Sequence, residues 1–173
     1  MNKIFNPNKS RIYFDQYLFI SITLLSFMGL LFLYSASQGN TETIIKQSFF
    51  VVFGLILMFV LSQPDPDFYK NNALFFLILS IILIFLTMLV GKEVNGAQRW
   101  LDLGFFTLQS SEIIKIALPV FLAAYLYDKP LPINLFETFV TLVLIFTIVN
   151  LVRIQPDLGT SLVILIAGLY ILF

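Results

Sequence analysis

Residues 73–90 read ALFFLILSIILIFLTMLV, a run in which Ser80 and Thr87 are the only polar residues. A helix of about 20 such residues crosses the hydrocarbon core of a bilayer, because each residue adds about 1.5 Å to its length. A helix at the surface of a soluble protein would carry charged residues along one face, and this run contains none. The stretch therefore predicts a transmembrane helix.

The composition of the whole chain supports a membrane protein. Of its 173 residues, 59% are apolar, 16% are aromatic and 12% are charged. The charged share is about half that of an average soluble domain, so the polar side chains are too few to cover a surface that faces water. The composition therefore argues against a soluble domain of any size.

Working outward from 73–90, similar apolar runs predict an all-α fold, a polytopic membrane helix bundle with six spans in one membrane domain, 17–173. The fourth span is the weakest, because it is short, begins with charged residues and contains a proline, and it could instead be re-entrant. No polar flank follows the last span, so we expect the chain to be truncated. The predicted spans are 17–37, 44–63, 73–90, 112–127, 135–154 and 158–173.

The orientation follows from the basic residues at the start of the chain, Lys3, Lys9 and Arg11. Positive charge is retained on the cytoplasmic side of a membrane, so the N-terminal tail, 1–16, is predicted to lie in the cytoplasm. Loop 91–111 then lies outside the cell. Because the Lys and Arg residues divide evenly between the two predicted sides, those on the outer side need another explanation, such as a functional site.

The residue types limit the chemistry of such a site. The chain has no Cys and no His, which excludes thiolate and imidazole metal sites and any catalytic triad built on His. Its formal net charge of zero argues against binding to nucleic acid. The site must therefore use carboxylates, Lys, Arg and amides; no cofactor is predicted, and a divalent cation is left open.

The first polar cluster lies in loop 91–111, GKEVNGAQRWLDLGFFTLQSS. Apolar and polar residues alternate around Trp100, which predicts an extended segment on the membrane surface. In a purely structural interpretation Trp100 is an interfacial anchor and Arg99 binds a lipid phosphate or forms an ion pair with Asp102. In a functional interpretation Arg99 and Trp100 contact a ligand.

The second cluster is formed by Glu112 and Lys115, which lie three residues apart and share one face of a predicted helix. Ser110 or Ser111 is expected to cap this helix. The helix dipole favours Glu112 near the N-terminus but disfavours Lys115. We therefore expect an ion pair that points into the bundle, formed within this pair or with charged residues of the third cluster.

The third cluster, 153–160, reads RIQPDLGT and contains Arg153 and Asp157. Asp157 either caps the following helix or takes part in function as a carboxylate at the membrane surface. Cations on one face suit a phosphate or pyrophosphate, so the predicted ligand is an anionic lipid. Transfer of a sugar from a lipid pyrophosphate also needs a carboxylate base, and Glu112 and Asp157 are the carboxylates nearest the cations.

Three segments, GAQRWLDLG at 96–104, QSSEIIKIALP at 109–119 and QPDLGTS at 155–161, resemble motifs of the SEDS family. The resemblance implies a peptidoglycan glycosyltransferase of the bacterial inner membrane that polymerises lipid II for cell elongation and rod shape, or in division, with a class B penicillin-binding protein as partner. The implied substrate-binding residues are Arg99, Trp100, Glu112, Lys115, Arg153 and Asp157.

Two departures from the family pattern affect these expectations. The family usually has Pro where this chain has Ser110, which makes the entry to the fourth span less rigid here. The Asp generally regarded as catalytic in the family lies beyond Phe173. No catalytic residue is therefore assigned, and the chain alone is expected not to polymerise lipid II.

Two other classes of function are compatible with the same residues. The first is a lipid II flippase or transporter that uses the cations as a path for the headgroup. The second is a non-catalytic membrane subunit that binds a cell-wall synthase. Formation of glycan strands from purified lipid II would separate the polymerase from both.

Overall fold

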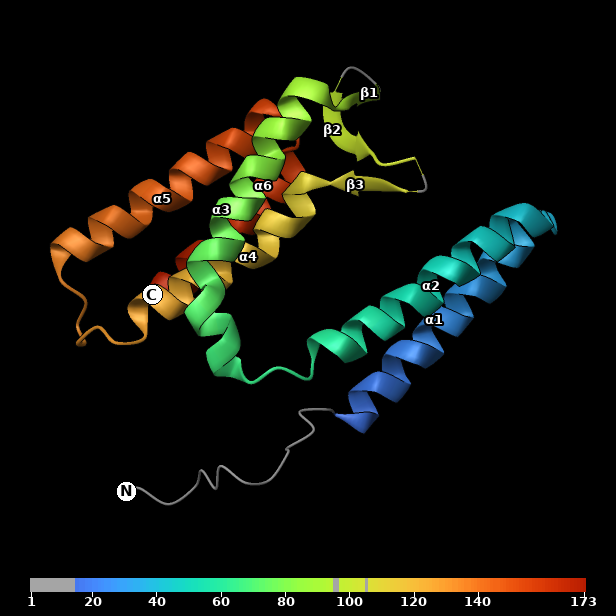
Figure 1. Cartoon of the computed structure of the whole chain (residues 1–173), viewed down its shortest axis with the longest axis horizontal. Coiled ribbons are helices and arrows are strands. Elements are labelled where there is room, and N and C mark those ends of the chain that lie inside the picture. The colour runs from blue at the N-terminus through green and yellow to red at the C-terminus, as the bar shows by residue number, and fades with distance from the viewer. Residues whose placement is uncertain (1–14, 95–96, 105) are drawn as a thin grey trace. The chain divides into compact units, whose positions relative to one another are not determined.

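The computed structural model describes residues 15–94, 97–104 and 106–173 (Figure 1). The chain divides into two compact units, Met1–Asp65 and Pro66–Phe173, and each is described by itself. The first contains α1 (Gln16–Ala36) and α2 (Thr41–Leu61). The elements of the second are α3 (Pro66–Val90), β1 (Lys92–Val94), β2 (Ala97–Asp102), β3 (Thr107–Gln109), α4 (Ser110–Leu126), α5 (Leu135–Ile154) and α6 (Leu158–Leu172).

Each predicted span corresponds to a helix, so the chain is a helical membrane protein. Four of the described helices, α1, α2, α3 and α5, are long and apolar enough to cross a membrane. The other two are shorter: α6 has 15 residues, and α4 has 17 with Pro119 inside it. At about 1.5 Å per residue these two fall short of a core about 30 Å thick. Six helices are therefore confirmed within the described residues, whereas six spans remain a proposal.

The first unit is a hairpin of α1 and α2, which contact each other. Both helices are capped by side chains: Asp15 accepts from the amide of Tyr17 at 2.9 Å, and Asn40 accepts from the amide of Thr43 at 3.2 Å. Neither helix has a buried residue within the described part of the chain. Apolar side chains exposed on all sides are expected of helices that face lipid or other membrane helices.

The second unit packs four helices around one apolar core. α4 contacts α3 and α6, and α6 also contacts α5. At the contact of α5 and α6, Gly168 lies so close to Ile145 that a Cβ atom would be 2.9 Å from Cγ1 of Ile145. Small residues at such contacts allow membrane helices to approach closely. The core residues are Leu77, Ile84, Ile114, Leu118, Leu122, Ile145, Ile148, Val152 and Ile164.

A small sheet departs from the all-α prediction. β1, β2 and β3 form an antiparallel sheet in that order, in which Trp100 of β2 pairs with Lys92 of β1 and Gln109 of β3. Gly104, at φ +83°, makes the turn between β2 and β3, where its amide donates to Oδ1 of Asp102 at 2.9 Å. The predicted extended segment is thus a paired strand, because backbone groups near a membrane need hydrogen-bond partners.

Candidate functional site

The three polar clusters meet at one end of the second unit, where the sheet, the start of α4 and the turn before α6 lie together. Arg99 of β2 joins the sheet to the turn before α6. Its Nε donates to the carbonyl oxygen of Gln155 at 2.9 Å, and its Nη2 donates to the carbonyl oxygen of Pro156. β2 is therefore fixed onto the turn between α5 and α6, so the first and third clusters lie together.

The predicted ion pair between Arg99 and Asp102 is wrong. Asp102 pairs with Lys92 of the neighbouring strand at 3.5 Å. The side chain of Arg99 instead reaches the backbone carbonyls of Gln155 and Pro156. The guanidinium of Arg99 is occupied by backbone carbonyls, which leaves it less available to a phosphate than the sequence indicated.

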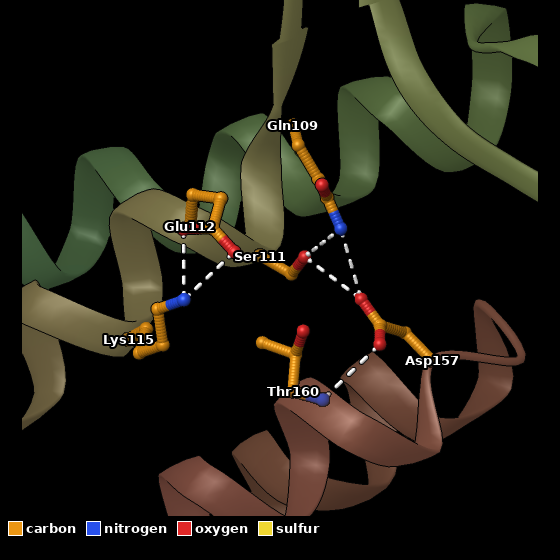
Figure 2. Close-up of polar contacts among 6 residues, drawn as sticks. All are labelled: Gln109, Ser111, Glu112, Lys115, Asp157 and Thr160. Atoms are coloured by element: carbon orange, nitrogen blue, oxygen red, sulfur yellow. Dashed lines mark hydrogen bonds and ion pairs between the residues drawn. The ribbon is translucent and has the colours of Figure 1, made fainter. Parts of the chain in front are cut away.

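Asp157 is the buried carboxylate of the site, with 8% of its surface exposed. Its Oδ1 accepts from the amide of Thr160 at 3.1 Å, which confirms Asp157 as the N-cap of α6. Its Oδ2 accepts from Nε2 of Gln109 at 2.9 Å and from Oγ of Ser111 at 3.2 Å (Figure 2). One carboxylate therefore joins the end of β3, the first turn of α4 and the start of α6.

The expected capping of α4 by a serine side chain does not occur. Gln109 occupies the N-cap position and makes no side-chain capping bond. Ser111 donates to Asp157 instead, and Oγ of Ser110 is buried with no hydrogen-bond partner among the described residues. The side chains of Gln109 and Ser111 thus reach the residue that caps α6, which the pattern of residues around the helix start could not indicate.

The pKa of Asp157 is lowered from its ordinary value of 3.8. Burial by itself raises this pKa, but hydrogen bonds from the amide and side chain of Thr160 and from Ser111, together with the charge of Arg99, outweigh burial. The ionised carboxylate is therefore the stable form in the folded protein. Its contribution to stability is present above the unfolded pKa and is lost as the pH falls through the folded pKa.

We therefore expect the thermal unfolding midpoint of the protein in a non-ionic detergent to fall when the pH is lowered from 7 to below about 4. In Asp157→Asn the fall should be smaller, because the group that titrates is absent. Asp102→Asn is the control, since Asp102 is exposed and solvent screens its interactions. An equally steep fall in Asp157→Asn and in the unsubstituted protein would contradict this assignment.

Glu112 and Lys115 form the predicted ion pair. Nζ of Lys115 lies 2.7 Å and 2.8 Å from the two carboxylate oxygens of Glu112 (Figure 2). The Glu112 side chain is 53% exposed and that of Lys115 is 31% exposed, so the pair lies on an open face of α4 and is not buried within this unit. The expectation that the pair points into the bundle is therefore not met among the described residues.

The other two candidate residues, Trp100 and Arg153, are at least partly exposed. Trp100 is half-buried on the central strand of the sheet. Arg153 is exposed in the last turn of α5, where the helix dipole favours a cation, and within the described ranges it forms no ion pair. No group of three or more acidic side chains that could hold a metal ion occurs in the described part of the chain.

Comparison with known proteins gives a consistent set of relatives. A family model described as cell cycle protein, FTSW_RODA_SPOVE, matches residues 15–173. The chain is 36% identical to the peptidoglycan glycosyltransferase MrdB of Escherichia coli K12, over 97% of this chain and 46% of that protein. It is 35% identical to the peptidoglycan glycosyltransferase RodA of Treponema pallidum, over 88% of this chain and 36% of that protein. The chain thus spans half or less of the length of these relatives.

Solved structures share the fold. The crystal structure of the rod shape determining protein RodA of Thermus thermophilus superposes with a TM-score of 0.81 at 28% identity, covering 90% of this chain and 52% of that chain. A chain from a peptidoglycan synthase complex superposes with a TM-score of 0.79 at 30% identity, covering 88% of this chain and 45% of that chain. The fold is therefore shared with proteins of related sequence.

Proposed function

This chain belongs to the SEDS family, whose FTSW_RODA_SPOVE model it matches, and we propose that it forms the substrate-facing part of a peptidoglycan glycosyltransferase that polymerises lipid II. The observation that carries the proposal is the ion pair of Glu112 and Lys115 on the open face of α4. A charged pair on a helix of a membrane protein is costly unless it faces a polar cavity or a ligand. A lipid pyrophosphate is such a ligand.

Lys115 is suited to the pyrophosphate of lipid II. An ammonium group has three donors, and Nζ of Lys115 contacts only the carboxylate of Glu112 among the described residues, so a donor is free for a phosphate oxygen. Glu112 holds the ammonium group of Lys115 in position before the substrate arrives. When the substrate binds, Glu112 can also accept hydrogen bonds from sugar hydroxyls.

Two further residues can complete the binding surface. Arg153, exposed at the end of α5, can add a second positive charge for the pyrophosphate. Trp100, half-buried on the sheet, can pack against a sugar ring or against the first isoprene units of the lipid. We assign no catalytic base to these residues. Asp157 is unsuitable as a base, because it is buried and its oxygens already accept three hydrogen bonds.

The same proposal includes the location of the protein, its orientation in the membrane and its partner. The protein would span the bacterial inner membrane six times, with the N-terminal tail, 1–16, in the cytoplasm and loop 91–111 on the outer side. Its proposed partner is a class B penicillin-binding protein, which the likeness to a chain of a peptidoglycan synthase complex supports. No cofactor is proposed.

Binding is tested with the chain in lipid nanodiscs and fluorescent lipid II. We expect saturable binding that unlabelled lipid II displaces and phosphatidylglycerol does not. Activity is tested with the full product of the gene and a class B penicillin-binding protein in proteoliposomes, where glycan strands on a gel support the proposal. Movement of lipid II across the bilayer with no glycan product would instead support a flippase. Equal displacement by both lipids would refute specific binding.

A further inference from the structure

We propose that Asp157 and Gln109 are positioning residues, which set the first turn of α4 and so hold Glu112 and Lys115 in place without contacting substrate. This inference rests on the proposed function, in which that ion pair binds the lipid pyrophosphate. It changes the role that the sequence indicated for Asp157. The contact between Asp157 and Gln109 joins residues 48 positions apart, at 2.9 Å.

Asp157 has little capacity left for a ligand. Both of its oxygens accept hydrogen bonds, from Thr160 on one side and from Gln109 and Ser111 on the other (Figure 2). A carboxylate offers about four acceptor positions, and three are filled within the protein. Because the residue is also buried, little of the carboxylate is open to a substrate.

The start of α4 depends on this contact. The first amides of a helix have no partner inside the helix and are commonly satisfied by the N-cap side chain. Gln109 is the N-cap residue of α4, but its side chain makes no capping bond and reaches across to Asp157 instead. Ser111, in the first turn, donates to the same oxygen. The first turn is therefore held by α6, and Glu112 is the next residue along it.

The other side of the turn before α6 is also fixed. Arg99 donates to the carbonyl oxygens of Gln155 and Pro156, directly before Asp157. Nε2 of Gln155 donates to the carbonyl oxygen of Ile84 in α3 at 3.4 Å. Hydrogen bonds from the sheet and to α3 thus hold the backbone next to Asp157. When the contact between Asp157 and Gln109 changes, the start of α4 is therefore the segment expected to move.

An exchange of the two side chains tests the proposal. Asp157→Asn replaces the hydrogen bond from Gln109 to a charged acceptor with a weaker one between two neutral amides, and Gln109→Glu places two carboxylates face to face, so each change should weaken the contact. The double variant Asp157→Asn with Gln109→Glu restores one amide and one carboxylate with the same total charge. We expect each single variant to weaken lipid II binding by about threefold or more, and the double variant to return within about twofold of the unsubstituted protein.

Hydrogen exchange of the amides of residues 110–116 provides a measurement that does not depend on lipid II. It should rise in both single variants and return in the double variant, while exchange in α5 stays unchanged. Asp102→Asn is the matched control, a carboxylate at the same end that also accepts from a backbone amide, and it should leave binding and exchange unaltered.

The outcomes separate the two proposals. Failure of the unsubstituted chain to bind lipid II would refute the proposed function, and the exchange measurement would still test the positioning role. Lost binding in the double variant with normal exchange at 110–116 would show that Asp157 contacts the substrate. Raised exchange throughout α5 and α6 in the single variants would show a general loss of folding. Either result would overturn the positioning role.

Discussion

Lys115→Ala is expected to weaken the binding of lipid II to the protein by about tenfold or more. A hydrogen bond to a charged group contributes about 1.5–3 kcal/mol, and about 1.4 kcal/mol corresponds to a factor of ten in affinity. The substitution also leaves the carboxylate of Glu112 without its partner at 2.7 Å, next to a pyrophosphate of the same charge. Loss of attraction and gain of repulsion therefore act together. The measurement is titration of fluorescent lipid II into nanodiscs that hold the protein.

The matched control is Lys92→Ala, which removes a lysine from the same end of the same unit. Lys92 also pairs with a carboxylate, but at 3.5 Å, and its side chain is 62% exposed. An exposed pair of this kind contributes about 0–1 kcal/mol, so binding should change by less than about fivefold. If both variants changed binding by the same small factor, Lys115 would have no role in recognising the lipid.

The helices of this protein could be predicted well because a bilayer leaves few alternatives to a helix for an apolar run. The predicted span 135–154 coincides with α5. The helix α3 begins at Pro66, before the predicted span 73–90, because its first two turns are polar and a scan for apolar residues does not detect them. Proline fits the first position of a helix, where its missing amide is not needed.

The sheet and much of the site could not be predicted, since both depend on contacts between distant residues. The ion pair of Glu112 and Lys115 was predictable because a spacing of three places side chains together on a helix. The pair of Arg99 and Asp102 shows the opposite case, because Arg99 reaches the distant turn before α6 and Asp102 pairs with Lys92 of the neighbouring strand. No local pattern indicates that Gln109 reaches Asp157, although both lie in quoted motifs.

Gly168→Val is expected to destabilise the second unit by about 1–3 kcal/mol, the usual cost of inserting a side chain into a packed core. A Cβ atom at this position would lie 2.9 Å from Cγ1 and 3.0 Å from Cδ1 of Ile145, so α5 and α6 must move apart. For a chain of this size each kcal/mol lowers the unfolding midpoint by about 2–4 °C. Thermal unfolding in detergent, followed by circular dichroism, measures the change.

Gly159→Val is the matched control, because it places the same side chain on the same helix where a Cβ atom would meet nothing within 4 Å. It should cost less than Gly168→Val, since no neighbouring atom is displaced and the helix propensity of valine is higher than that of glycine. Adding Ile145→Ala to Gly168→Val removes the atoms in conflict, and the pair should be less destabilising than the sum of the two single changes. Additive effects, or equal losses at Gly159 and Gly168, would show that the close approach of α5 and α6 at Gly168 does not limit the packing of this unit.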